Sequence, residues 1–165
     1  MKLSTITFVL LAAGASFASP APLAERASIT DKAVIRFAAL NGGTTGGGSA
    51  TPVTVTTLDA LQKAVSGGSA KVVLISGVIQ GATKVKVGSN KSLIGNSGAS
   101  LGGVGISIGS VSNVILRNVK ISKVLAEHRD AIGIAASNRV WIDHVEVFSD
   151  RDHDKDYYDG LIDVT

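Results

Sequence analysis

A pattern of short apolar stretches that recurs every 20 to 26 residues constrains the fold of this chain more than any other feature. Residues 114–121 and 140–147 share one order of apolar and polar positions, at an offset of 26. A shorter match aligns residues 92–96 with 114–118 at an offset of 22. Repeats of this length, each too short to bury its own apolar face, are typical of solenoids.

A second series of alternating residues lies between the first stretches. Residues 84–87, 105–108 and 131–134 follow one another at offsets of 21 and 26. Two or three short strands per repeat predict a parallel β-solenoid, in which inward residues are buried by stacking of successive coils. An antiparallel sandwich also has turns at short spacing, but it does not explain why the two octets share both a pattern and a separation.

The segments before the repeats predict an N-terminal cap. Residues 41–52, rich in glycine, predict a flexible loop, and residues 53–55 alternate like a strand. Thr57 can cap a short helix that places Leu58, Leu61 and Val65 on one face. About four coils fit after Lys71, so we expect a solenoid that is incomplete at its C-terminal end.

The N-terminus has the features of a secretory signal. A lysine is followed by the apolar run 6–18, which ends in small residues, so residues 1–18 are predicted to be a signal peptide and 19–36 a short pro-region. Residues 37–165 then form the domain. No apolar run is long enough to span a bilayer. The chain has no cysteine, so a secreted form must be held by packing, hydrogen bonds or a metal.

Charge is divided unevenly along the chain. Residues 127–165 carry ten acidic and four basic residues, a formal charge of −6, whereas the remainder has a formal charge of +9. The basic residues are scattered and are not interleaved with aromatic residues, which argues against nucleic-acid binding. The acidic end is instead suited to a cation.

Three aspartates in this acidic end can converge. Asp130 and the pair Asp159 and Asp163 are about one coil apart, and stacked coils are separated by about 4.8 Å. Three neighbouring carboxylates need a proton or a bridging cation, and oxygen-only ligands favour Ca²⁺. From spacing alone, a solvated acidic loop without an ion explains them equally well. An EF-hand is rejected because its glycine position holds Tyr157 and its flanks are strand-like.

Several motifs in order resemble the parallel β-helix pectate lyases of fungi and bacteria. They are FAALNGGTTGGG (37–48), VKVGSNKSLIG (85–95), NVILRNVKIS (113–122) and the long run VWIDHVEVFSDRDHDKDYYDGLIDV (140–164). The resemblance covers nearly the whole chain after the signal. It implies an all-β fold, a right-handed parallel β-helix with a short N-terminal capping helix.

The resemblance also implies a site and a chemistry. Asp130, Asp159 and Asp163 match the family's calcium ligands, and the substrate is polygalacturonate, which is cleaved by β-elimination. The family's base is an arginine on a later coil, beyond Thr165, so no residue of this chain is assigned as the catalytic base. The other four aspartates of the run 150–156 are expected to form a solvated loop, and His144 to belong to a structural turn. Tyr157 and Tyr158 are expected to stack on sugars or to pack locally.

The resemblance to this family implies a secreted polysaccharide lyase, which acts on an acidic polysaccharide and is a monomer at full length. Retention of the three acids favours a pectate lyase over a pectin lyase, which shares the fold but lacks this calcium site. A non-catalytic calcium- or polysaccharide-binding β-solenoid is the alternative from another class. For the chain as it stands, we expect weak or no lyase activity.

Overall fold

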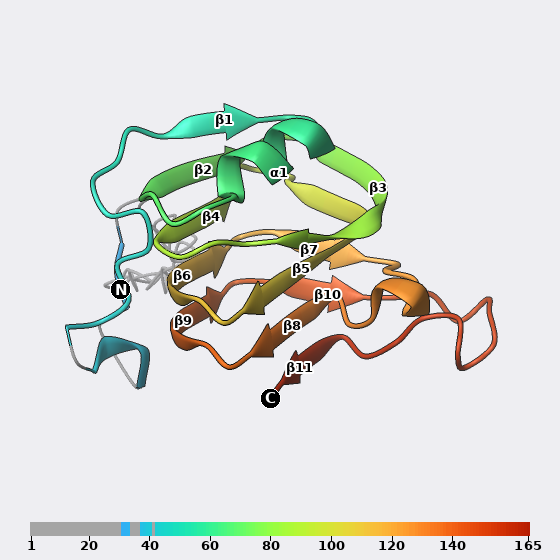
Figure 1. Cartoon of the computed structure of the whole chain (residues 1–165). Helices are drawn as coiled ribbons and strands as arrows, with labels where there is room; N and C mark the ends of the chain where they lie inside the picture. Colours follow the sequence, from blue (N-terminus) through green and yellow to red (C-terminus); the bar gives the residue numbers. More distant parts are fainter. Residues whose placement is uncertain (1–30, 34–36, 41) are drawn as a thin grey trace, which may run out of the picture.

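The computed structural model describes residues 31–33, 37–40 and 42–165. The predicted signal peptide (1–18) lies outside these residues, as does most of the predicted pro-region (19–36). Within the described part, successive turns of the chain stack from β1 and α1 at one end to β9 and β11 at the other (Figure 1). None of the helices in these residues has the length and apolar character needed to cross a membrane.

Two parallel sheets form the walls of the coil. The first contains, in spatial order, β1 (Val53–Val55), β2 (Lys71–Ile75), β4 (Lys91–Gly95), β6 (Ser112–Arg117) and β9 (Asn138–Asp143). The second contains β3 (Val78–Lys86), β5 (Ser100–Gly109), β7 (Lys120–Ser122), β8 (Ile132–Ala135), β10 (Glu146–Phe148) and β11 (Ile162–Val164). Two short 3₁₀ helices, η1 (Phe37–Ala39) and η2 (Ala126–His128), lie outside the sheets.

Parallel pairing confirms the predicted β-helix and excludes the antiparallel sandwich. Every ladder between named strands is parallel, and the one isolated antiparallel bridge in the described chain joins Leu125 to Tyr158. The long strand β5 pairs with β7 near its start and with β8 near its end. The second wall therefore divides into two branches after β5.

Strand register tests the repeat offsets directly. Val114 pairs with Val140 and Lys120 with Glu146, so the predicted offset of 26 is confirmed. Offsets of 21 and 26 in the second series are also confirmed. The predicted offset of 22 is wrong, because Lys91 pairs with Val114 at an offset of 23. Both faces of β4 and β6 are buried, so their apolar runs do not alternate and the sequence leaves the register open by one residue.

Rows of aliphatic side chains, one from each coil, fill the interior. Val73, Leu93 and Leu116 are successive register partners in the first sheet, and all are fully buried. Val85, Ile106 and Ile132 form a matching row in the second. Each coil thus buries its apolar face against its neighbours.

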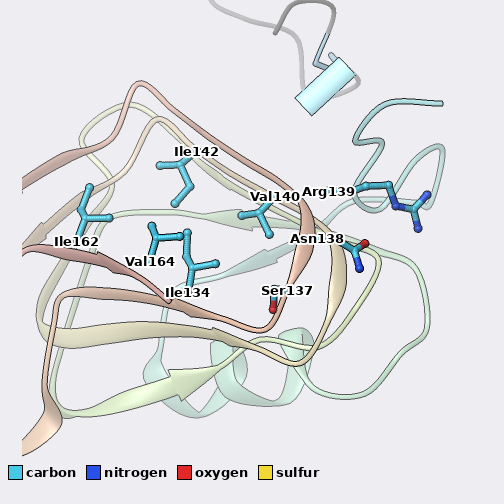
Figure 2. A pocket seen from close by; sticks show the side chains of 8 residues that line it. All are labelled: Ile134, Ser137, Asn138, Arg139, Val140, Ile142, Ile162 and Val164. Carbon is cyan, nitrogen blue, oxygen red and sulfur yellow. The ribbon is translucent and has the colours of Figure 1, made fainter. Parts of the chain in front are cut away.

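The interior is open at the last coil. A hollow of about 560 Å³ is lined by apolar residues of β8, β9 and β11 and by the turn between β8 and β9 (Figure 2). Ile162, the next member of the row after Ile132, is 49% exposed. Burial therefore falls away along the described solenoid from the middle coils to the last strand.

The predicted capping helix is confirmed as α1 (Leu58–Val65). Thr57 adopts an extended conformation and its hydroxyl accepts a hydrogen bond from the Ala60 N–H, as an N-cap should. Leu61 and Val65 are fully buried against the first coil. The helix therefore covers the apolar end of the solenoid, above β2 and β3 (Figure 1).

The glycine-rich segment before β1 is a loop, as predicted, and hydrogen bonds attach its middle part to the first sheet. Asn113 Oδ1 accepts hydrogen bonds from the N–H groups of Thr45 (2.8 Å) and Gly46 (2.9 Å), and Ser92 Oγ accepts one from Gly47 (2.9 Å). A side chain at Gly47 would collide with the Lys71 carbonyl. The glycines are needed because the backbone lies directly on the outer face of the first sheet.

A lysine is fully buried beside this loop. Lys91 Nζ donates to the carbonyl oxygens of Gly67 and Ser69 (both 2.7 Å) and Ser89 (2.9 Å). Three carbonyl acceptors satisfy all three donors of the ammonium group. The buried charge therefore holds the turn after α1 against the turn before β4.

Candidate functional site

The candidate site lies on the outer face of the second sheet, where β3, β5, β8 and β11 are stacked. Lys86, Ser107, Gly133 and Asp163 are successive register partners across these strands. They alternate with the buried row that contains Ile106, so they belong to the outward face. The two middle positions carry a serine and a glycine, so the row has no bulky side chain between the lysine and the aspartate.

Asp130 is positioned by a sharp turn that leads into β8. The helix η2 ends at His128, and Arg129 directly after it combines a positive φ (61°) with an extended ψ (−156°). Directly after Asp130, the Ala131 N–H donates to the Gly160 carbonyl at 3.1 Å, and the Ile132 N–H donates to Leu161 at 3.0 Å. These bonds place Asp130 beside the Asp159–Gly160 segment of the next coil, as the one-coil spacing predicted.

Two glycines make room for the Asp130 carboxylate. A Cβ atom built on Gly160 would collide with Asp130 Oδ1. A Cβ atom on Gly133 would stand 4.0 Å from Asp130 Oδ2. The carboxylate therefore lies over backbone that has no side chains, with Asp163 on the strand beside Gly133.

A lysine that the sequence analysis did not single out shares this space. Lys84 of β3 extends to Gly133, where Nζ would lie 3.1 Å from a Cβ atom. The pKa of Lys84 is lowered, chiefly because burial disfavours its charged form. The nearby charge of Arg129 also lowers this pKa, whereas the carboxylates of Asp130, Asp159 and Asp163 oppose the shift. The three predicted aspartates and two cationic groups therefore interact electrostatically at one place.

The carboxylates of Asp130, Asp159 and Asp163 are not close enough together to form a metal-binding group. Among the residues that the structure describes, no group of three or more His, Cys, Asp or Glu side chains is arranged to hold a metal ion. The fold places Asp163 beside Gly133 and joins the turn after Asp130 to the segment that follows Asp159. The role of the three aspartates as ligands remains a prediction.

The acidic loop 150–160 corrects part of the sequence prediction. Asp152, Asp154 and Asp156 are exposed, as expected for a solvated loop. Asp150 is different, because its carboxylate accepts hydrogen bonds from Tyr158 and the Asp152 N–H and pairs with Lys123 at 2.9 Å. The Asp150 carboxylate is therefore held by Lys123 and by two hydrogen-bond donors of its own loop. Composition alone does not reveal these partners.

The aromatic residues of this loop pack locally. The rings of His153 and Tyr157 are stacked with centroids 3.9 Å apart, and Tyr158 lies edge-on to both. His153 Nδ1 also lies 2.9 Å from Asp150 Oδ1. The loop is thus fixed through Asp150, at the base of the segment that carries Asp159.

Two further sequence interpretations concern the motifs around the site. The EF-hand pattern over 152–163 is flanked by the strands β10 and β11, so its rejection is confirmed. His144 occupies a turn with a left-handed backbone (φ 50°) after β9, and its Nδ1 lies 2.8 Å from Asp143 Oδ1. The turn position agrees with the structural role predicted for this histidine.

Comparison with known proteins relates this geometry to one family. A protein-family model described as pectate lyase matches residues 6–165. The chain is 52% identical over 144 residues to the probable pectate lyase A of Aspergillus niger, covering 86% of this chain and 44% of that protein. It is 56% identical over 157 residues to the probable pectate lyase A of Aspergillus fumigatus, covering 94% of this chain and 48% of the relative.

Solved structures agree with the fold. A pectate lyase from Bacillus sp. N165, determined in complex with trigalacturonate, matches with a TM-score of 0.71 and 30% identity, over 78% of this chain and 47% of that one. A thermostable pectate lyase matches with a TM-score of 0.68 at 22% identity, over 76% of this chain and 53% of that one, which supports the fold alone. The chain spans about half the length of the curated relatives it matches.

Proposed function

Because the chain belongs to the pectate lyase family, we propose that it supplies the cation-binding coils of a secreted, calcium-dependent pectate lyase that cleaves polygalacturonate by β-elimination. The observation that carries the proposal is the meeting of Asp130 with the Gly160 segment of the next coil. Asp159 and Asp163 flank that glycine, so the three acids predicted as ligands belong to two adjacent turns of the solenoid.

The donor set fits a calcium ion. The proposed ligands are carboxylate oxygens only, which Ca²⁺ prefers over nitrogen or sulfur. Gly160 and Gly133 have no side chains of their own that would displace the Asp130 carboxylate. Asp130, Asp159 and Asp163 would hold the ion.

The chemistry follows from the charge of the substrate. A bound Ca²⁺ would neutralise a sugar carboxylate and make the adjacent C5 proton easier to remove. The aspartates of this chain fix where that carboxylate sits, and the small residues Ser107 and Gly133 leave the outer face of the sheet accessible for a polysaccharide. Loss of the C5 proton with cleavage of the C4–O bond leaves an unsaturated uronide end and consumes no water. No residue of this chain is assigned as the base, because the family resemblance places the arginine base beyond Thr165.

Secretion and the oligomeric state belong to the same proposal. The apolar run 6–18 supports export through a signal peptide, with the enzyme acting outside the cell as a monomer on acidic polysaccharide. Mass spectrometry of the protein collected from culture medium tests this part, since an N-terminus close to Ser19 is expected. An intact Met1 on protein retained in the cells contradicts it.

The experiment for catalysis joins residues 37–165 to the C-terminal part of the Aspergillus niger relative. The chimera is expected to release unsaturated uronides from polygalacturonate in proportion to added Ca²⁺, and the chimera with Asp159→Asn and Asp163→Asn is expected not to. The 165-residue chain alone, measured alongside, is expected to show weak or no release.

Three results would count against the proposal. Binding of polygalacturonate by a folded chimera without product release would favour a non-catalytic binding solenoid. Calcium-independent cleavage of methyl-esterified pectin would favour a pectin lyase. Equal release by the native chimera and the double variant would remove Asp159 and Asp163 from the site.

A further inference from the structure

We propose that Lys84 is a substrate-binding residue, whose ammonium group binds a uronate carboxylate beside the cation held by Asp130, Asp159 and Asp163. The inference rests on the proposed function and adds to it a residue from an earlier coil. It assigns β3 a part in selecting an unesterified, acidic polysaccharide.

The first support is the reach of the Lys84 side chain. Lys84 pairs with Gly105 on the adjacent strand, which contributes no side chain at this register position. The lysine therefore extends across β5 to β8, with Nζ and Cε 3.1 Å and 3.6 Å from the position of a Cβ at Gly133. The same vacant position lies 4.0 Å from Asp130 Oδ2, so ammonium and carboxylate border one space.

The second support is that this ammonium group has unused donors. Lys63, Lys120, Lys123 and Lys155 each pair with a carboxylate, and Lys91 is satisfied by three carbonyls. Within the described part of the chain, Lys84 Nζ makes neither a hydrogen bond nor an ion pair. Lys84 is partly buried and its three donors have no protein acceptor in this part of the chain, so an anionic ligand can take them in place of water.

The third support is the balance of charge around Lys84. Asp130, Asp159 and Asp163 act on it together with Arg129, so three carboxylates face two cationic groups and the local formal charge is −1. A uronate carboxylate is repelled by this arrangement. A divalent cation reverses the local charge to +1, so the sugar should bind after the ion and Lys84 should contribute only then.

The test measures binding by the full 165-residue chain in isothermal titration calorimetry. Trigalacturonate is titrated at saturating CaCl₂ into the native protein and into Lys84→Met, Lys84→Arg and Lys63→Met. Lys63 is the control, because it is an exposed lysine on the capping helix α1, outside the second sheet. Ca²⁺ is also titrated alone, and trigalacturonate methyl ester replaces the free acid in a parallel series.

Lys84→Met should weaken trigalacturonate binding about 10- to 100-fold, as expected for loss of one charge-assisted hydrogen bond. Lys63→Met should change it less than about twofold, and Lys84→Arg should retain most of the affinity. Ca²⁺ alone should bind Lys84→Met no more weakly than the native chain, and the methyl ester should not distinguish the two. With Ca²⁺ and trigalacturonate present, Lys84 should also be protected from acetylation, as measured by mass spectrometry.

Other outcomes overturn the inference. Unchanged trigalacturonate affinity in Lys84→Met, with tighter Ca²⁺ binding, would make Lys84 an internal counter-ion of the aspartates. Equal weakening of Ca²⁺ and sugar would make its role structural. If the native chain binds neither ligand, the proposed function fails as well, whereas binding that ignores Lys84 refutes this inference alone.

Discussion

The docking of the glycine-rich loop on the solenoid depends on one buried side chain, and replacing it should have a large and measurable cost. Asn113 has a left-handed backbone (φ 62°), and its amide binds the loop in both directions. Oδ1 accepts from the N–H groups of Thr45 and Gly46, and Nδ2 donates to the Gly46 carbonyl (3.1 Å) and to Asn90 Oδ1 (2.9 Å). Asn113→Ala leaves these groups without partners in a water-poor place.

The magnitude follows from two contributions. Loss of the network should cost about 3–5 kcal/mol, since each buried group left unsatisfied costs about 1–3 kcal/mol. Alanine in a left-handed conformation adds about 1 kcal/mol. The total of about 4–6 kcal/mol is a large part of the about 5–15 kcal/mol that stabilises a typical domain.

Asn118→Ala is the matched control at the other end of the same strand. Asn118 also has a left-handed backbone (φ 54°), but its exposed side chain donates one hydrogen bond, to the Gly95 carbonyl at 2.6 Å. Its replacement should cost about 2 kcal/mol, with the same backbone contribution. The difference between the two variants therefore isolates the buried network.

Urea unfolding followed by tryptophan fluorescence measures both variants. Trp141 is the single tryptophan, and the Arg117 guanidinium lies 4.5 Å from the centre of its ring on the sheet wall. Hydrogen exchange of the Thr45 and Gly46 amides should rise in Asn113→Ala and not in Asn118→Ala. Equal free energies of unfolding for the two variants would refute the reasoning.

Further predictions concern the acidic loop, the glycine cradle, the buried lysine and the core. The Lys123 ammonium, followed by His153, lowers the pKa of Asp150 from its ordinary 3.8, so the carboxylate stabilises the fold above that pH and ceases to do so as the pH falls below it. The difference in melting temperature between native protein and Asp150→Asn should therefore shrink from about pH 5 to about pH 2, and a constant difference would contradict this. Gly160→Ala should displace the Asp130 carboxylate and weaken Ca²⁺ binding at least about tenfold in calorimetry, with Gly68→Ala, at an open position without a positive φ, as the control. Lys91→Met should lower the free energy of unfolding by about 2–4 kcal/mol, because three carbonyls lose their donor while the cost of burying a charge is relieved. Ile106→Ala, at a fully buried position, should cost about 2–5 kcal/mol in urea unfolding, whereas Val78→Ala, at an exposed one, should cost little.

The fold was predictable wherever the apolar pattern alternates. Val85, Ile106 and Ile132 follow polar or small neighbours, so their register of 21 and 26 residues could be obtained from the sequence. Lys91 and Ser92 could not be placed to the residue, because both faces of β4 are covered. The outer face of β4 and β6, which would otherwise meet solvent, is covered by the glycine-rich loop, and the polar residues Ser92 and Asn113 that bond this loop lie within the strands.

The candidate site was predictable in part for a similar reason. Asp130, Asp159 and Asp163 are acidic residues at coil spacing, and pairing of β8 with β11 brings their segments together. Lys84 was missed because nothing in its neighbourhood is unusual, and its reach depends on Gly105 and Gly133, which come from two other coils. Asp150 was misjudged because its partner Lys123 belongs to the preceding coil.

Calcium titration of the full chain tests the central claim most directly. Ca²⁺, with trigalacturonate present, is titrated into the native protein and into Asp130→Asn, Asp159→Asn and Asp163→Asn, with Asp154→Asn as an exposed control from the same acidic loop. We predict saturable binding that each of the three variants weakens at least about tenfold, and that Asp154→Asn leaves unchanged. A folded native chain that binds no Ca²⁺, or that binds it equally in all five proteins, would contradict the account.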